Sequence, residues 1–505
     1  MHRQASIEPS LPFTRSQRRV GWLVAAVTIT LGGTALALLV WAVASVFLRQ
    51  PLYSEAMILF NASRIREGLP LYVPAVIGAH EYGEPPARYW VAYTPVYATI
   101  LAAIPSAAAL VVARLLGLFA WYAALIRSVL RARPGDRARA AIAALFLASI
   151  YRFMSEAASA KPDALALLVV VVALDRVLDR RGADARAGLL FALAALIKPS
   201  VFGAAIGALA ASSLVTRRIR GSLAAAATLA TAFAGLQLAT GGLGLSHLRA
   251  AVALEFQLEL AQSTVPARFV FVAGLIALAA LGAWQARRDA SARIGLAALA
   301  SSIVVAAIGF GKVGASTNYL MEPSLVSLLL ICRFRPQMPR RLVSTFALAS
   351  ALGVTFVWST NASIRSLAGQ TRELGSAVPA LERIRGRCAG REGEIVLSSD
   401  PGTELVVNGR LHSHPIELTA ETMSGRFPEP VWVADVQHPN VRCYVAGVGD
   451  DGAPPRPPGS FPPAVADALR ERFVLSFVDS GYAVYETEPR TVASPSPARQ
   501  QLETR

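Results

Sequence analysis

Long apolar runs alternate with short arginine clusters over the first 360 residues of the chain. A helix that crosses a bilayer needs about 20 predominantly apolar residues, and most of the runs approach or exceed that length. The pattern therefore predicts an α-helical, polytopic membrane domain over residues 20–360. The predicted spans are Val20–Leu48, Ala107–Leu130, Arg139–Met154, Pro162–Leu178, Ala187–Leu214, Leu223–Thr240, Phe269–Ala286, Ile294–Phe310, Tyr319–Cys332 and Leu342–Ser359.

One of these runs, Ala187–Leu214, is interrupted in its middle by Lys198-Pro199. Proline breaks the interior of a helix, so we interpret this run as a hairpin of two short helices. With the hairpin counted as two, the pattern predicts about eleven crossings. Pro199 suits the first turn of a helix, which would place Lys198 at a helix N-terminus, where backbone N–H groups attract anions.

The arginine clusters predict the orientation of the spans. Basic residues concentrate on the cytoplasmic side of a membrane, and the segments 49–106, 155–161, 241–268 and 311–318, which lie between the clusters, are predicted to lie outside. Segment 1–19 is then cytoplasmic, and the part that follows the last span is extracytoplasmic. The clusters lie at Arg15–Arg19, Arg127–Arg139, Arg180–Arg186, Arg217–Arg220, Arg287–Arg293 and Arg333–Arg341.

Beyond residue 360 the apolar runs end, and the amino-acid composition over residues 361–487 is typical of a soluble domain. Residues 361–385 have the pattern of an amphipathic helical linker, and residues 464–472 that of a helix. A small α/β or α+β domain is predicted, followed by a Pro- and Ser-rich tail, 488–505, typical of disorder. The predicted strands are Glu394–Ser398, Thr403–Val407, Val431–Val436, Val441–Ala446, Phe473–Val478 and Ala483–Glu486.

Composition supports this division of the chain. Hydrophobic residues make up 54% and charged residues 16% of the 505 residues, whereas soluble chains are about 25% charged. The net charge of +16 resides in the membrane-flanking clusters, so no nucleic-acid partner is expected. Cys388 and Cys443 both fall in the soluble domain and could pair in an oxidising compartment. His412, His414 and His438 would suggest a zinc site, in which the first two share one face of a strand. No fourth zinc ligand is placed by spacing, so structural or surface histidines are expected.

Only three of the 49 basic residues are lysines. In the predicted topology Lys161 and Lys312 lie at the outer ends of spans, and Lys198 lies at the tip of the hairpin. An ionisable group at membrane depth costs about 2.5–3.5 kcal/mol on insertion scales and tends to line a polar cavity. The three lysines therefore suggest a site for an anion such as a lipid-linked phosphate, although side chains that snorkel to the headgroups would look the same.

The first outer loop, 49–106, is long and polar. Met57, Phe60, Ile65 and Leu69 recur at roughly helical spacing, which predicts an amphipathic helix lying on the membrane. Glu55 begins this helix. A carboxylate at a membrane–water boundary can act as a base, but an acidic residue in a first turn is also a favourable partner of the helix dipole.

Several stretches together resemble the GT-C superfamily of integral membrane glycosyltransferases, in particular bacterial members related to the protein O-mannosyltransferase and aminoarabinose transferase group. The first is S-E-A-x5-A-x3-R-E-G-L-P-L-Y over residues 54–72, followed by Y-T-P-V-Y at 93–97. The others are K-P-D-A-L-A-L-L at 161–168, A-L-I-K-P-S at 195–200 and G-A-S-T-N-Y-L-M-E-P at 314–323. They are distributed over most of residues 20–360.

The resemblance implies transfer of a hexosyl or pentosyl group from a polyprenyl-phosphate donor, on the outer face of a bacterial inner membrane. The acceptor would be a protein, glycan or lipid. In the family an acidic residue of the first loop is the base, often within an Asp-Glu pair. Here the pair is Ser54-Glu55, so Glu55 alone would take the proton and the transfer would invert the anomeric centre. No organic cofactor is expected, and the need for a divalent metal is left open.

Further residues are expected to bind the substrate. Lys161, Lys198 and Lys312 would stabilise the departing phosphate, and Asp163 either joins them or only neutralises Lys161. Glu322 falls in an apolar run, where a polar cavity is expected around it. The remaining candidates are Arg88, Tyr93, Asn318 and Tyr319.

Two other functions are compatible with the same sequence features. A transporter or flippase of a lipid-linked or anionic substrate would also use a broken helix and intramembrane charges, but the chain has no internal repeat. A catalytically inactive GT-C-like assembly partner is compatible with Ser54 at the family's acidic position.

Overall fold

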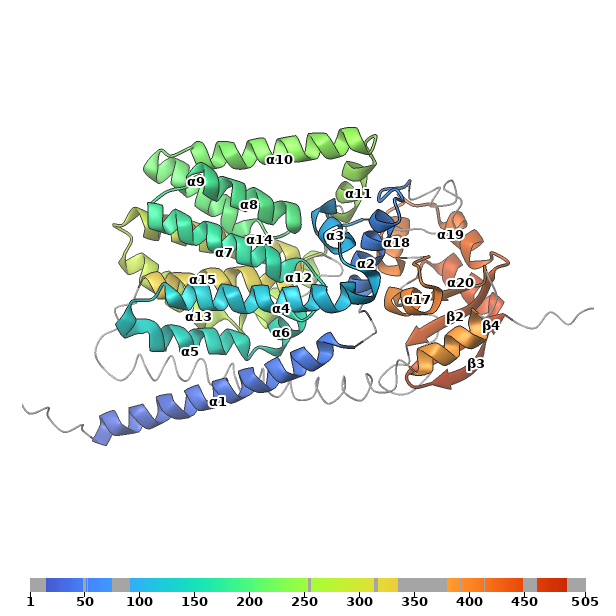
Figure 1. The fold of residues 1–505 in the computed structure, drawn as a ribbon, viewed down its shortest axis with the longest axis horizontal. Helices are drawn as coiled ribbons and strands as arrows, with labels where there is room; N and C mark the ends of the chain where they lie inside the picture. The colour runs from blue at the N-terminus through green and yellow to red at the C-terminus, as the bar shows by residue number, and fades with distance from the viewer. Residues whose placement is uncertain are drawn as a thin grey trace, which may run out of the picture.

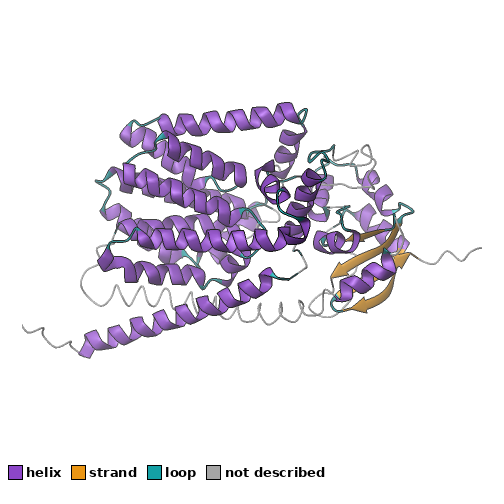
Figure 2. Cartoon of the chain, viewed as in Figure 1, coloured by secondary structure: helices purple, strands orange, loops and turns teal. Residues whose placement is uncertain are grey.

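The structure is a computed structural model, and Figure 1 shows its two parts. A bundle of long helices occupies one end, and the C-terminal domain, which holds the strands of the described residues, lies at the other (Figure 2). The residues described are 15–48, 51, 53–74, 91–252, 256–312, 317–334, 379–389, 393–412, 414–447 and 461–487.

Each predicted span that falls on described residues has a helix. The helices of the bundle are α1 (Arg15–Val46), α4 (Ser106–Leu130), α5 (Arg137–Ala148), α6 (Tyr151–Ala157), α7 (Asp163–Arg180), α8 (Ala185–Ile197), α9 (Gly203–Thr216), α10 (Arg220–Ala239), α13 (Ala273–Gln285), α14 (Ala290–Phe310) and α15 (Met321–Arg333). The last predicted span, Leu342–Ser359, lies outside the described residues. The mostly helical fold with a small C-terminal sheet confirms the predicted fold class.

By length and composition, four helices among the described residues can cross a membrane on their own: α1, α4, α10 and α14. Two bent pairs raise this number to six if each pair is one span: α5, with the short turn before it, joins α6 at 75°, and α12 (Leu258–Phe269) joins α13 at 76°. Residues 139–154 are thus not the single helix that the sequence predicted, because Ile150 takes an extended conformation between α5 and α6.

The hairpin predicted from Lys198-Pro199 is present as α8 and α9. The place of Lys198 in it was predicted wrongly. Lys198 follows the last residue of α8 in an extended conformation, at φ −141° and ψ 102°, as expected for a residue that precedes proline. The next helix begins only at Gly203, so Lys198 stands at a helix C-terminus and not at an N-terminus.

The segment predicted as the first outer loop contains α2 (Tyr53–Arg66) and α3 (Pro95–Ala102), which lie between the bundle and the C-terminal domain (Figure 1). The prediction of a helix lying on the membrane was wrong for α2. Its apolar side chains Met57 and Phe60 are buried together with Leu411 of the C-terminal domain, and Ile58 packs on the other side against Tyr97 and Ala113. The helix is therefore enclosed by protein on two sides.

The C-terminal domain is a four-stranded sheet covered by helices. The strands are β1 (Ile395–Ser398), β2 (Val441–Gly447), β3 (Phe473–Asp479) and β4 (Tyr482–Thr487), in the order β1-β2-β4-β3, with β1 parallel to β2 and the other neighbours antiparallel. The helices are α17 (Pro401–Asn408), α18 (Pro415–Met423), α19 (Glu429–Val436) and α20 (Pro463–Arg472), besides a helix over residues 379–388.

Two of the predicted strands were wrong. Residues 403–407 belong to α17 and residues 431–436 to α19. Both apolar runs begin after capping signals that strand periodicity does not register: Asp400 accepts hydrogen bonds from Gly402 N and Thr403 N, and Pro430 occupies the first turn of α19. Such signals mark a helix start.

Cys388 and Cys443 form a disulfide that ties the helix over 379–388 to β2. His412 and His414 lie between α17 and α18 and not on a strand, and both are buried. Among the described residues, no three histidine, cysteine, aspartate or glutamate side chains are placed to hold a metal ion together.

The C-terminal domain contacts the loop that precedes α2 at backbone level. A Cβ atom added at Gly402, in the first turn of α17, would overlap the carbonyl oxygen of Pro51. Leu405 and Leu411 of the domain continue the contact against the cluster that contains Met57. The domain therefore supports the segment that carries Glu55.

His247, on α11 (Leu243–Val252), connects the two described ends of the outer loop. Its Nε2 bonds the Val73 carbonyl oxygen at 2.7 Å, and its Nδ1 accepts from Val91 N at 3.0 Å. Only the neutral ring, protonated at Nε2, can make both bonds. Burial lowers the pKa of His247, partly offset by the bond to Val73.

This histidine makes stability depend on pH. Its pKa is lower in the folded than in the unfolded protein, so its contribution is complete above the unfolded value, about 6.5, and is lost as the pH falls from there through the folded value. We expect the Tm of the wild type to drop more between pH 7.5 and 5 than that of His247→Gln, measured by thermal unfolding in detergent. Parallel curves for the two proteins would contradict this assignment.

Candidate active site at the outer-loop end of the bundle

Glu55 lies in the first turn of α2 and has no exposed surface. Its carboxylate forms a two-pronged ion pair with Arg114 of α4: Nε donates to Oε1 at 2.8 Å and Nη2 to Oε2 at 2.6 Å. The amide of Ala160 also donates to Oε1, at 2.6 Å. Such a planar pair is the strong form of a salt bridge.

Arg114 also holds the end of the first helix. Its Nη1 donates to the carbonyl oxygens of Ser45 at 3.0 Å and of Leu48 at 2.8 Å. Ser45 lies in the C-terminal turn of α1, where carbonyl groups lack intrahelical donors, and Leu48 follows two residues after the helix ends. One guanidinium therefore joins α1, α2 and α4, and it fixes where Glu55 stands.

A glycine on α4 lets the next part of the site approach. A Cβ at Gly117 would overlap the carbonyl oxygen of Ala157, at the end of α6. The absence of a side chain there lets residues 157–160 pass close to α4, so that Ala160 N reaches Glu55. Three residues later the chain reaches Asp163, the first residue of α7.

Asp163 and Lys198 form a second buried ion pair. Lys198 Nζ lies 3.1 Å from Asp163 Oδ2 and 3.0 Å from the hydroxyl of Tyr93. Asn318 Nδ2 donates to Asp163 Oδ1 at 2.7 Å. Both ion-paired side chains are at most 5% exposed. Four residues predicted as candidates from separate stretches of the sequence thus meet at one point.

The partner of Lys161 differs from the predicted one. Its Nζ pairs with Glu156 at 2.8 Å, so Asp163 is not its direct neutraliser. Lys312 follows α14, and its backbone forms an isolated antiparallel β-bridge with Phe256. Arg88, the remaining basic candidate, lies outside the described residues.

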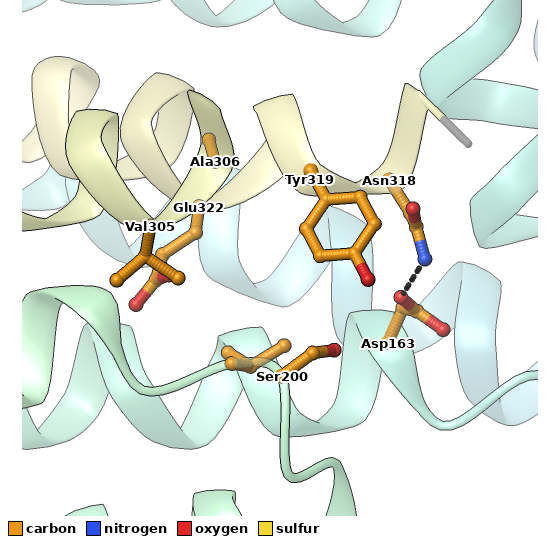
Figure 3. A pocket seen from close by; sticks show the side chains of 8 residues that line it. Asp163, Ser200, Val305, Ala306, Asn318, Tyr319 and Glu322 are labelled. Atoms are coloured by element: carbon orange, nitrogen blue, oxygen red, sulfur yellow. Dashed lines mark hydrogen bonds between the residues drawn. The ribbon is translucent and has the colours of Figure 1, made fainter. Parts of the chain in front are cut away.

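A small cavity borders the second ion pair (Figure 3). Its lining includes Asp163, Ser200, Asn318, Tyr319 and Glu322. The ring of Tyr319 points toward Ser200, and Glu322 lies at the opposite end of the cavity from Asp163. Glu322 therefore borders a cavity that is lined by both polar and apolar side chains.

Glu322 holds the second helix of the hairpin. Its Oε1 accepts from Ala204 N at 2.8 Å, in the first turn of α9. This cap fixes the N-terminus of α9. The segment 198–202 joins this point to Lys198, so Glu322 helps to define where the ammonium group stands.

Two arginines that the sequence did not single out lie near this region. Arg268, at the end of α12, donates to Thr317 Oγ1 at 3.0 Å, immediately before Asn318. Arg114 was also missed from the sequence alone, because a single arginine within an apolar run does not indicate which residue it pairs with.

Comparisons with known proteins identify similar folds. No protein-family model matches the chain, and no curated protein matches it either. Two solved structures of ArnT from Cupriavidus metallidurans are similar. The one bound to undecaprenyl phosphate has a TM-score of 0.53 and 15% identity, and the match covers 92% of this chain and 98% of that one. The apo structure has a TM-score of 0.54 and 13% identity, and the match covers 93% and 98%.

The similarity extends over the bundle and the C-terminal domain together, because almost the full length of both chains is matched. The protein therefore has the fold of the ArnT structures, and this confirms the fold that the sequence resemblance predicted. At this level of identity the similarity defines the fold alone.

Proposed function

We propose that this protein is a membrane glycosyltransferase that moves a sugar from a polyprenyl-phosphate donor to an acceptor hydroxyl. The observation that carries the proposal is the presence of two buried ion pairs, Glu55 with Arg114 and Lys198 with Asp163. The short segment 160–163 connects them, because Ala160 N donates to Glu55 and Asp163 belongs to the second pair. Proximity of a carboxylate and a cation is what such a displacement requires. The shared fold supports the donor class, since one ArnT structure is bound to undecaprenyl phosphate.

In the proposed reaction Glu55 is the general base. The acceptor oxygen attacks the anomeric carbon, its proton goes to Glu55, and the bond from the anomeric carbon to the phosphate oxygen breaks. The polyprenyl phosphate leaves with additional negative charge, which Lys198, Lys161 and Arg268 would stabilise. Direct displacement inverts the anomeric configuration.

The other candidates have supporting roles in this proposal. Tyr93 and Asn318 position Lys198 and Asp163, and Glu322 fixes the hairpin. Tyr319 lines the cavity in which we place part of the donor. Lys312 and Arg88 stay proposed contacts of the substrate.

We also propose that this chemistry takes place outside the cytoplasmic membrane of a bacterium, with the N-terminus inside. The disulfide between Cys388 and Cys443 supports an extracytoplasmic C-terminal domain, because disulfides persist in oxidising compartments. The domain contacts Pro51 and α2, so the outer loop and the site near it would lie on the same side.

The test is transfer of a labelled sugar from polyprenyl-phosphate donors by the purified protein in lipid nanodiscs. Loss of a general base costs about 10²- to 10⁴-fold, so Glu55→Gln is expected to reduce kcat at least 100-fold. Glu67→Gln, an exposed carboxylate just beyond the same helix, is the matched control and should retain wild-type activity.

Undiminished transfer by Glu55→Gln would remove Glu55 as the base. Movement of the lipid-linked substrate across the membrane without a new glycosidic bond would favour the transporter alternative. A wild-type protein that binds the donor but transfers nothing would favour the inactive assembly partner.

A further inference from the structure

The hydroxyl of Tyr97 has no hydrogen-bond partner among the described residues. Tyr97 belongs to α3, and its side chain is 2% exposed. An unpartnered buried hydroxyl costs stability, and most buried polar groups in proteins have a partner, often an ordered water. A phenylalanine would fill the same space without that cost. The hydroxyl therefore needs an explanation other than packing.

The surroundings of the ring place Tyr97 between the two ion pairs. The ring packs with Ile58, one turn after Glu55 on α2, and with Ala160, whose amide bonds Glu55. Leu165, two residues after Asp163, lies against the same cluster. Burial, followed by the charges of Asp163 and Glu55, raises the pKa of Tyr97.

Glu55 in its described state is closed off from substrate. It has no exposed surface, whereas Asp163 borders the cavity. A base without surface can receive a proton only from a group that reaches it through the enclosed space. That group must carry an O–H whose proton points to the carboxylate of Glu55. Its oxygen must in turn accept a hydrogen bond from a neighbouring donor.

We propose that the Tyr97 hydroxyl binds a hydroxyl group between Glu55 and Asp163, either the acceptor's own or that of a bridging water. The phenol donates its proton in a hydrogen bond to the oxygen of this group, whose O–H then points to Glu55. Tyr97 is a substrate-binding residue if the group is the acceptor's, and a positioning residue if it is a water. This inference rests on the proposed function, because it assumes that Glu55 accepts the proton.

The test compares Tyr97→Phe with Tyr151→Phe, since the hydroxyl of Tyr151 is also buried without a partner among the described residues, beside Trp41. Neither change is expected to lower the Tm, because each removes an unpartnered hydroxyl. Tyr97→Phe should reduce transfer about 10-fold or more, as for one lost hydrogen bond in a closed site, and Tyr151→Phe should leave it unchanged.

The kinetic constants distinguish the two sources of the hydroxyl. A higher KM for the acceptor in Tyr97→Phe assigns the site to the acceptor, and a lower kcat with unchanged KM assigns it to a bridging water. Wild-type kcat and KM in Tyr97→Phe would overturn the inference. If Glu55→Gln is fully active while Tyr97→Phe is not, the role of Glu55 fails and the binding site at Tyr97 stands.

A second measurement does not depend on turnover. High-resolution maps of the wild type, with and without acceptor, should show an ordered oxygen within about 3.2 Å of the Tyr97 hydroxyl. The same oxygen should be missing in Tyr97→Phe. An empty position next to the hydroxyl in both wild-type maps would contradict the inference even in the absence of measurable transfer.

Discussion

Replacing Arg114 by methionine is expected to destabilise the protein by about 3–5 kcal/mol, the usual effect of removing one partner from a buried ion pair. The change removes the cation from the buried carboxylate of Glu55, which also accepts a hydrogen bond from the amide of Ala160. It also leaves carbonyl oxygens at the end of α1 without the donors that Arg114 supplies. Thermal and denaturant unfolding in detergent measure the loss, and a fall in transfer should accompany it.

The double variant Glu55→Met with Arg114→Met separates the ion pair from the other roles of the arginine. Since an apolar pair of similar volume can replace a buried salt bridge, the double variant should be more stable than Arg114→Met alone, yet inactive. Arg176→Met, which breaks the partly exposed pair of Arg176 with Asp184 on the same bundle, should change stability little. Equal stability of Arg114→Met and the wild type would show that the pair does not hold the outer loop.

The second large effect is expected at Lys198. Lys198→Met removes the ammonium that faces Asp163 and Tyr93, so Asp163 stays buried with Asn318 as a neutral partner. If Lys198 stabilises the departing phosphate, transfer should fall about 100-fold or more, the range seen when one such group is removed. Transfer kinetics over a range of donor concentrations, with the Tm of each variant, measure both consequences.

Asp163→Asn combined with Lys198→Met leaves no unpaired charge. This variant should regain much of the lost stability but none of the lost transfer. Arg186→Met is the matched control, because Arg186 is exposed at the other end of the same helix, α8. Wild-type transfer by the double variant would assign Lys198 and Asp163 a purely structural role.

Much of the fold could be predicted because the membrane imposes it on the sequence. The apolar runs reproduce the helices of the bundle where the structure describes them, and Pro199 correctly marks the break between α8 and α9. The limits of each helix could not be predicted in the same way. Residues 149–150 interrupt a predominantly apolar run that has no proline or glycine to mark the break. Pro199 delays the next helix to Gly203, which reverses the expected position of Lys198.

The sequence named several residues that the structure brings together, but it did not predict their contacts. Tyr93, Asp163, Lys198 and Asn318 come from distant stretches, and the structure brings them together. Their contacts depend on which faces of the helices pack against each other, and the hydrophobic pattern along the chain does not predict that packing. Arg114 shows the same limit, since its meaning comes from Glu55, 59 residues away.

In the C-terminal domain, apolar runs of five or six residues did not distinguish strands from short helices. Thr403–Val407 and Val431–Val436 have strand-like composition, but local capping by Asp400 and Pro430 decides for helices. The role of the domain was not predictable either. Its contact through Gly402 with Pro51 indicates that it supports the outer loop.

We propose above all that a polyprenyl phosphate binds beside Lys198, at the cavity bordered by Asp163. A structure of the protein in nanodiscs with undecaprenyl phosphate tests this binding most directly. We expect phosphate density within about 4 Å of Lys198 Nζ, an ordinary ion-pair distance, with Lys161 or Arg268 as a second cationic neighbour. Phosphate density at the opposite ends of these helices, near Arg180 and Arg217, would contradict the proposal.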